Sequence, residues 1–255
     1  MKLAYRKYGE GQPLLILHGL FGQSDNWNTL AKRFAENGFE VYTIDQRNHG
    51  LSPHSDVWNY DAMVDDIKEF IDEHNLQNPI LLGHSLGGKT AMFFALKYNG
   101  VLNKLIVVDM SPRAYKPHHD AVLDALNAVN FSQLNTRKEA EAVLNQYISD
   151  FGTKQFLLKN IYWEDNAANK MNWRFNLAAI TKNYNEILVA TPHQSSNVNT
   201  LFLKGEKSNY ITDIDLPEIE SRFPNYKLQT IANAGHWVHA QQPESFFNDV
   251  IGFIK

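Results

Sequence analysis

One serine of this sequence is flanked by glycines in a pattern that favours nucleophilic chemistry. Gly83-His84-Ser85-Leu86-Gly87 follows an apolar run and precedes a stretch with helical character. A turn of this kind is so tight that side chains at the glycine positions would clash, and the serine is lifted out of the sheet. The start of the helix adds N–H groups and a positive potential beside the serine. We therefore predict that Ser85 is a nucleophile.

The same residues also spell a second motif, which is a competing interpretation. Residues 83–90 fit G-x-x-x-x-G-K-[ST], the phosphate-binding loop of nucleoside-triphosphatases. Residues 105–109 resemble the apolar strand that ends in a magnesium-binding aspartate in those enzymes. A phosphate loop normally follows the first strand of its domain, whereas several strand signals precede this one. A plain strand-to-helix turn is the third interpretation, and the partners of Ser85 argue against it.

A glycine-bearing loop near the N-terminus is a candidate for stabilising negative charge. His18-Gly19-Leu20-Phe21-Gly22 comes directly after an early apolar run. Acyl transfer develops negative charge on the carbonyl oxygen, and a fixed N–H donor aimed at that oxygen is worth about 2.7–4 kcal/mol in other enzymes. We predict that the donors are the backbone N–H groups of Leu20 and Leu86. The structural alternative is a glycine turn that lets the chain pass close to Ser85.

A histidine near the C-terminus is the preferred candidate for a general base. His236 lies between the last predicted strand and the last predicted helix, at the sheet edge where a base must stand. The ordinary pKa of histidine, about 6.5, suits proton transfer at neutral pH. His239 is the second choice, while His18 and His49 are expected to brace loops. His118-His119-Asp120 is interpreted as a solvated helix rather than a metal site, and no cluster has zinc spacing backed by other ligands.

The elements that must position these residues can be read from short apolar runs that alternate with amphipathic stretches. Strands are expected at residues 13–17, 40–45, 79–82, 104–109, 200–204 and 227–231. Helices are expected at residues 29–37, 63–74, 86–98, 216–222 and 243–254. This alternation is typical of βαβ units, which build a parallel sheet covered by helices on both faces.

The alternation stops between residues 112 and 190. This part has no β-branched run comparable to the strands, and helices are expected over residues 121–129, 137–149, 154–159 and 173–184. Ligands of open parallel sheets bind beyond the carboxyl ends of the strands, so a helical block inserted there would cover the site. We predict a core of residues 1–111 and 191–255 with a helical lid of residues 112–190.

The composition is that of an ordinary globular protein and argues against several classes. The 255 residues are 44% hydrophobic and 20% charged, and a net charge of −4 offers no field suited to nucleic acid. The absence of cysteine removes disulfides, thiolate metal sites and a cysteine nucleophile. The N-terminus lacks the apolar stretch of a signal peptide, and no apolar run approaches the ~18–20 residues that span a bilayer. We expect a cytoplasmic protein without a membrane span.

Taken together, these motifs resemble those of the α/β-hydrolases. The nucleophilic serine, the acid and the histidine occur in the same order along the chain as in that family. Three runs look more closely like the small YbfF-type bacterial esterases and their mitochondrial abhydrolase relatives: Asp25-Asn26-Trp27, Asp45-Gln46-Arg47-Asn48-His49-Gly50-Leu51-Ser52 and Val107-Val108-Asp109-Met110-Ser111-Pro112. The resemblance implies ester hydrolysis, with acyl thioesters as alternative substrates; such a reaction needs no cofactor. On its own residues, the run from Asp45 to Ser52 is a glycine-bearing loop after a strand, for which we expect a structural role.

The acid that partners His236 has to be assigned indirectly. Many α/β-hydrolases carry it after the strand that follows the lid, in a Gly-x-x-Asp arrangement, but this sequence has Gly205-Glu206-Lys207-Ser208 there. Asp109 ends the strand that comes after the helix following Ser85, at the same sheet edge as Ser85. Adjacent strands lie about 4.8 Å apart, so an aspartate one or two strands away can reach a shared histidine. The YbfF-type resemblance also points to Asp109, so we predict that it is the acid. Glu206 and Asp213 are the reserve candidates, and a structural cap is the other interpretation of Asp109.

The combined prediction is a serine hydrolase that cuts a carboxylic ester or thioester through an acyl-enzyme, with Ser85, His236 and Asp109 as its triad. The alternative from another class is a degenerate hydrolase that only binds its ligand, as a receptor does. Short-to-medium acyl chains are expected, because no signature of a long apolar channel is present. An apolar pocket is predicted to be lined by aromatic side chains, with ordinary packing as the competing interpretation: Phe21, Tyr162, Trp163, Trp173, Phe175 and Trp237.

Overall fold

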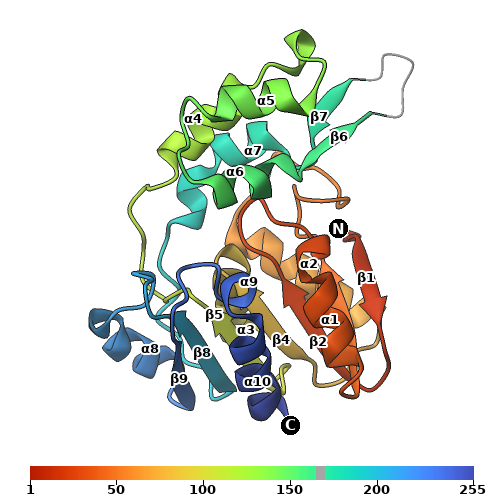
Figure 1. The fold of residues 1–255 in the computed structure, drawn as a ribbon. Coiled ribbons are helices and arrows are strands. Elements are labelled where there is room, and N and C mark those ends of the chain that lie inside the picture. Colours follow the sequence, from red (N-terminus) through yellow and green to blue (C-terminus); the bar gives the residue numbers. More distant parts are fainter. Residues whose placement is uncertain (165–169) are drawn as a thin grey trace.

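The computed structural model describes residues 1–164 and 170–255. Its main sheet has seven strands: β1 (Tyr5–Tyr8), β2 (Gln12–Leu17), β3 (Phe39–Ile44), β4 (Ile80–His84), β5 (Lys104–Val108), β8 (Asn199–Gly205) and β9 (Tyr226–Ile231). The strand order is β1-β3-β2-β4-β5-β8-β9, in which β1 is antiparallel to β3 and all other neighbours are parallel (Figure 1). The predicted α/β fold with a mostly parallel sheet is confirmed.

The two faces of the sheet carry separate apolar cores, because successive side chains of a strand point to opposite faces. On β2, for example, Leu15 packs into one core and Leu14 into the other. The helices of the first core are α2 (Tyr60–Glu73), α3 (Leu86–Lys97) and α8 (Leu216–Arg222). Those of the second are α1 (Asn28–Ala35), the short α9 (Val238–Gln241) and α10 (Pro243–Ile254). No helix within the described ranges is long and apolar enough to cross a membrane.

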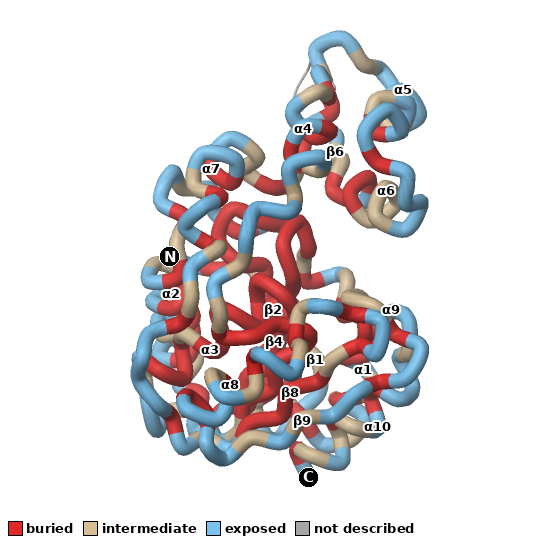
Figure 2. The backbone as a smooth tube through the Cα atoms, turned by 90° about the vertical axis from the view of Figure 1, so that its left-hand side faces the viewer, coloured by how far each residue is buried: buried red, intermediate tan, exposed pale blue. Residues whose placement is uncertain are grey.

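Residues 112–190 leave the sheet after β5 and rejoin it before β8. They contain α4 (Asp120–Ala128), α5 (Arg137–Leu144), α6 (Phe151–Leu158), α7 (Leu177–Lys182) and an antiparallel hairpin of β6 (Ile161–Trp163) and β7 (Met171–Trp173). This block stands beyond one edge of the sheet (Figure 1), and its apolar side chains join those of nearby core loops in a third core. Figure 2 shows the buried residues concentrated in the sheet, whereas buried and exposed segments alternate along the block.

The hairpin in this block corrects the sequence prediction. A helix was expected over residues 173–184, but Trp173 pairs with Ile161 in the hairpin, and α7 begins only at Leu177. The reason is a cap: the side chain of Asn176 accepts a hydrogen bond from the N–H of Ala179, which starts the helix there. In a strand of three residues, the alternation of apolar and polar side chains is too short to be recognised in the sequence. Such strands are identified only by their pairing in the structure.

Candidate active site

Ser85 stands at the turn between β4 and α3 in a strained backbone conformation. Its φ is 53° and its ψ is −117°, a combination that few residues other than glycine adopt. The flanking glycines are required for space: a Cβ on Gly83 would lie 2.1 Å from the carbonyl oxygen of Gly87, and one on Gly87 would lie 2.5 Å from that of Leu17. The turn therefore presents the hydroxyl of Ser85 at the carboxyl edge of the sheet, where ligands of such sheets bind.

Two backbone N–H groups beside Ser85 are free to hold an oxyanion. Leu86 is the first residue of α3, and the first N–H groups of a helix have no partner within it. Leu20 lies in the loop after β2, and in the described part of the chain neither N–H donates to a protein acceptor. The loop is fixed by Gln46, whose side-chain amide donates to the carbonyl oxygen of His18 at 2.8 Å. Both predicted donors thus lie beside the predicted nucleophile.

His236 and Asp109 form a hydrogen-bonded pair at the same edge of the sheet. Nδ1 of His236 lies 2.7 Å from Oδ2 of Asp109, whose carboxyl is completely buried at the end of β5. The carboxylate also accepts hydrogen bonds from the N–H of Gly205 at 3.2 Å and from the hydroxyl of Ser208. Three donors thus converge on one carboxylate and hold it in place. With the Nδ1 proton directed at Asp109, Nε2 of His236 is the nitrogen that can accept a proton.

Two side chains that the sequence analysis did not select support this pair. The ring of Tyr210 stacks on the imidazole of His236, with centroids 3.9 Å apart and planes at 16°. The hydroxyl of Tyr210 lies 2.6 Å from Nε2 of His118, and its N–H donates to Ser208. The role of Ser208 could have been suspected from the sequence, because Ser208 occupies the position at which many α/β-hydrolases carry the aspartate of the triad. Tyr210 has no comparable signal, since its contact with His236 is purely tertiary.

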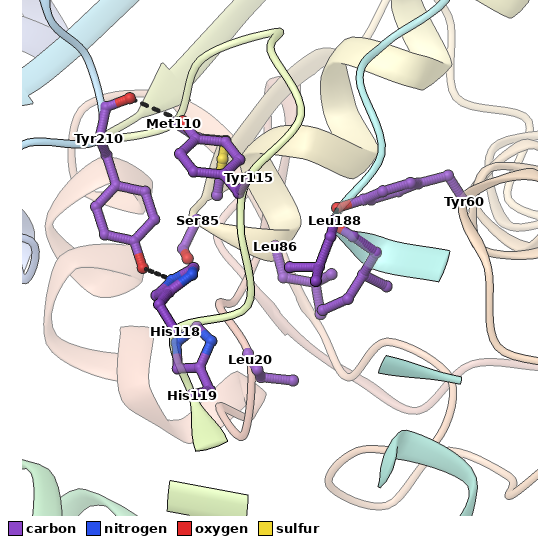
Figure 3. A pocket seen from close by; sticks show the side chains of 11 residues that line it. Leu20, Tyr60, Ser85, Leu86, Met110, Tyr115, His118, His119, Leu188 and Tyr210 are labelled. Carbon is purple, nitrogen blue, oxygen red and sulfur yellow. Dashed lines mark hydrogen bonds between the residues drawn. The ribbon is translucent and has the colours of Figure 1, made fainter. Parts of the chain in front are cut away.

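Ser85 and His236 line one cavity of about 160 Å³ together with Phe21 and Trp237, two of the predicted pocket aromatics. A smaller hollow of about 30 Å³ adjoins it at Ser85 (Figure 3). Among the described residues, Ser85 and His236 form no hydrogen bond with each other. In sites without substrate such hydrogen bonds are often long, and they shorten when substrate binds.

The other predicted pocket aromatics do not reach this cavity. Trp173 and Phe175 line a separate surface hollow, as does Tyr162, and Trp163 is 47% exposed on β6. Phe175 stacks on Trp173 with planes at 13° and contacts the ring of Phe21, with centroids 4.9 Å apart. They are displaced because the hairpin and the segment after it pack behind Phe21 rather than over Ser85.

The competing histidines have other surroundings. His239 is buried and stacks on Trp27, with centroids 4.2 Å apart, and burial lowers the pKa of its imidazole to about 3. His18 and His49 are buried in loops and hydrogen-bonded to backbone groups, as predicted. His119 corrects a prediction: it is partly buried rather than solvated, borders both hollows at Ser85, and burial lowers its pKa to about 3.

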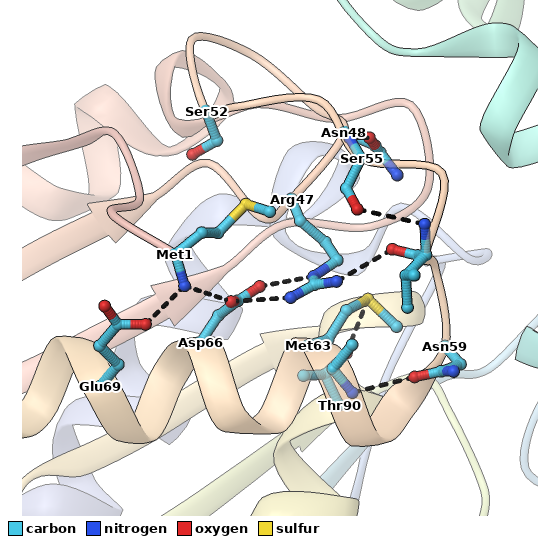
Figure 4. A network of polar contacts seen from close by, with 12 residues as sticks. Met1, Arg47, Asn48, Ser52, Ser55, Asn59, Met63, Asp66, Glu69 and Thr90 are labelled. Carbon is cyan, nitrogen blue, oxygen red and sulfur yellow. Dashed lines mark hydrogen bonds and ion pairs between the residues drawn. The ribbon is translucent and has the colours of Figure 1, made fainter.

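The loop from Asp45 to Ser52 has the contacts of a structural brace. The Asp45 carboxylate accepts hydrogen bonds from two backbone N–H groups. Arg47 donates to both carboxylate oxygens of Asp66 on α2, at 2.6 and 2.8 Å, and the amino group of Met1 donates to the same carboxylate at 2.8 Å (Figure 4). These polar groups are engaged with one another, and they tie the loop to α2 and to the N-terminus.

Lys89, the lysine of the competing phosphate-loop motif, is completely buried. Its Nζ donates to the backbone carbonyl oxygens of Ser111, Pro112 and Arg113, at 3.0, 3.0 and 2.5 Å. Three carbonyl acceptors match the three N–H bonds of an ammonium group. The lysine therefore ties α3 to the beginning of the 112–190 block, and it is not available to a phosphate in the cavity.

Comparisons with known proteins identify the family of this chain. A family model described as the alpha/beta hydrolase fold matches residues 12–243. Esterase YbfF of Escherichia coli is 34% identical over 244 residues, 95% of this chain and 93% of that protein. The sn-1-specific diacylglycerol lipase ABHD11 of Mus musculus is 38% identical over 250 residues, 94% and 80% of the two chains. The solved structure of a marine microorganism esterase has a TM-score of 0.96 and 43% identity, covering 99% of both chains. The predicted resemblance is confirmed, and the chain belongs to the α/β-hydrolase family.

Proposed function

We propose that this protein hydrolyses carboxylic esters through an acyl-enzyme, with Ser85, His236 and Asp109 as its catalytic triad. The observation that carries the proposal is that His236, hydrogen-bonded to the buried Asp109, and the strained Ser85 turn meet at one cavity. The printed names of the relatives, an esterase and a diacylglycerol lipase, describe enzymes that cut carboxylic esters. A degenerate hydrolase that only binds its ligand would have no need of this arrangement.

The chemistry follows from the positions of the donors and acceptors. Nε2 of His236 takes the proton of Ser85 as Oγ attacks the acyl carbon, and the N–H groups of Leu20 and Leu86 bind the oxyanion. Asp109 holds the imidazole in the required tautomer and stabilises its charged form. The bond to the leaving group then breaks, and His236 gives that group its proton. Water repeats the sequence on the acyl-enzyme, releases the carboxylic acid and restores Ser85.

We further propose that residues 112–190 act as a lid, because five of them form part of the cavity wall: His119, Val122, Thr153, Phe156 and Leu157. A wall contributed by the inserted block would exclude water from the acyl-enzyme. The same steps would cleave a thioester, so acyl-CoA thioesters belong in the same assay as the esters.

The test is a Ser85→Ala variant assayed with p-nitrophenyl acetate. Removal of the nucleophile costs roughly 10⁶ in kcat in the serine-protease precedent, and we expect a loss of several powers of ten here. A fluorophosphonate probe should label the wild type at Ser85 and leave the variant unlabelled. Ser221→Ala, at an exposed serine on α8, is the matched control and should keep full activity. Turnover retained in Ser85→Ala would refute the proposal.

A further inference from the structure

We propose that the two hollows at Ser85 divide the substrate, so that the site takes esters with a short acyl group and a larger leaving group. This inference rests on the proposed function. It concerns which half of the ester enters which hollow, and it follows from the order of proton transfers together with the shape of the cavity walls.

The position of His236 orients the substrate. The leaving group takes its proton from His236, so its oxygen must face that imidazole. His236 lines the cavity of about 160 Å³ but not the hollow of about 30 Å³, whereas Ser85 and Leu20 line both. The carbonyl oxygen is directed to the N–H groups of Leu20 and Leu86. The remaining substituent of the attacked carbon, the acyl chain, therefore points into the small hollow.

The small hollow is apolar and has little room. The side chains that give it this character are Leu20, Leu86, Met110, Ile187 and Leu188. Figure 3 shows them with the tyrosines and histidines that complete the wall around Ser85. About 10–15 Å³ of such space holds one water molecule, so a hollow of about 30 Å³ has room for only a small group, such as the methyl of an acetyl chain.

Hydrogen bonds hold the backbone of part of this wall in place. The hydroxyl of Tyr60 donates to the carbonyl oxygen of Ile187 at 2.9 Å, and the N–H of Tyr115 donates to that of Leu188 at 2.8 Å. The hydroxyl of Tyr115 in turn donates to the carbonyl oxygen of Tyr210 at 2.7 Å. A longer acyl chain would have to displace the apolar side chains of the lining or break these contacts.

The side of His236 is open in comparison. The cavity of about 160 Å³ meets a further hollow of about 370 Å³, and the two share Thr153, Phe156 and Trp237 as walls. The rings of Phe156 and Trp237 have centroids 4.4 Å apart, so they are in contact and form an apolar part of the wall between the two hollows. The lining of the further hollow is more polar, with Asn26, Gln155, Lys159 and Gln241 among its side chains. The cavity on the side of His236 is therefore the larger of the two at Ser85, and the leaving group has more room there than the acyl chain has in the small hollow.

A pair of isomeric esters tests the assignment directly. Hexyl acetate and ethyl hexanoate have the same composition and both release a primary alkanol, but the long chain is on opposite sides of the ester bond. We expect kcat/KM for hexyl acetate to exceed that for ethyl hexanoate at least tenfold. Equal values, or a preference for ethyl hexanoate, would overturn the assignment.

A variant locates the cause of the preference. Leu188→Ala enlarges the small hollow, and we expect the ratio of the two kcat/KM values to move at least fivefold towards ethyl hexanoate. Val189→Ala is the matched control, because this neighbouring side chain is 44% exposed and lines neither hollow at Ser85. A ratio that Leu188→Ala leaves unchanged, or that both variants move equally, would show that the hollow does not select the acyl chain.

Failure of this inference can be told apart from failure of the proposed function. If Ser85 reacts with a fluorophosphonate and the two isomers are hydrolysed equally well, the protein is a serine esterase and only the orientation is wrong. If Ser85 does not react and neither isomer is hydrolysed, the proposed function fails and this inference fails with it.

Discussion

Replacement of Asp109 by asparagine is the sharpest test of the triad, because the surroundings of this carboxylate are fully specified. It accepts from the N–H of Gly205, the hydroxyl of Ser208 and Nδ1 of His236. An asparagine with its oxygen towards His236 would oppose its NH₂ group to the N–H of Gly205. In the other orientation the NH₂ group faces Nδ1, which must then accept. The imidazole would carry its proton on Nε2 and could not take the proton of Ser85.

The size of the effect can be bounded from these contacts. A hydrogen bond to a charged group contributes about 1.5–3 kcal/mol. At about 1.36 kcal/mol for each tenfold change in rate, loss of the charged acceptor alone lowers kcat roughly 10- to 150-fold. The wrong tautomer of the imidazole lowers kcat further, and the full loss of kcat for the same Asp→Asn change in a serine protease is about 10⁴-fold. We therefore expect Asp109→Asn to lower kcat by about 10² to 10⁴.

The assay is steady-state hydrolysis of p-nitrophenyl acetate, with thermal unfolding as the check on folding. We expect the melting temperature of Asp109→Asn to stay within about 4 °C of the wild type. Glu206→Gln and Asp213→Asn are the matched controls, since both carboxylates are exposed, and each should keep kcat within tenfold. The reasoning is refuted if Asp109→Asn stays within tenfold while either control falls a hundredfold.

Three further predictions follow from the contacts around the site. Ser208→Ala removes one donor to Asp109, and we expect kcat to fall about tenfold while KM changes little, with Ser208→Thr restoring most of the loss. Burial lowers the pKa of Lys89 to about 7. Because the lysine of the unfolded chain keeps its ordinary, higher pKa, the unfolded chain binds more protons than the folded protein above pH 7. The free energy of unfolding of the wild type should therefore rise relative to that of Lys89→Met between pH 7 and pH 10, as measured by chemical denaturation. A fall over this range would contradict the prediction. Trp163→Ala should leave kcat/KM for hexyl acetate unchanged within twofold, because this exposed side chain lies away from the cavity; a tenfold change would place it at the site.

Much of the fold was predictable because its signals are local. The apolar runs that become the central strands are continuous, since these strands are buried on both faces of the sheet. The interruption of this rhythm after residue 111 marked the inserted block. The edge strand β1 gave no such signal, because three of its four residues are exposed. The hairpin β6–β7 was missed for a related reason: its strands have three residues each and exist only through their pairing.

The chemistry that this protein offers could be inferred from the order and spacing of its residues. The glycine spacing around Ser85 reports a turn whose sterics involve only a few neighbouring atoms, and the chain order of the strands places Asp109 and His236 at one sheet edge. The surroundings of these groups, in contrast, result from tertiary packing. The donors on Asp109, the ring over His236 and the two unequal hollows at Ser85 join residues that are far apart in the sequence, about a hundred positions in the case of Asp109 and Ser208. Such contacts depend on how the elements pack, and packing leaves no periodic pattern in the chain.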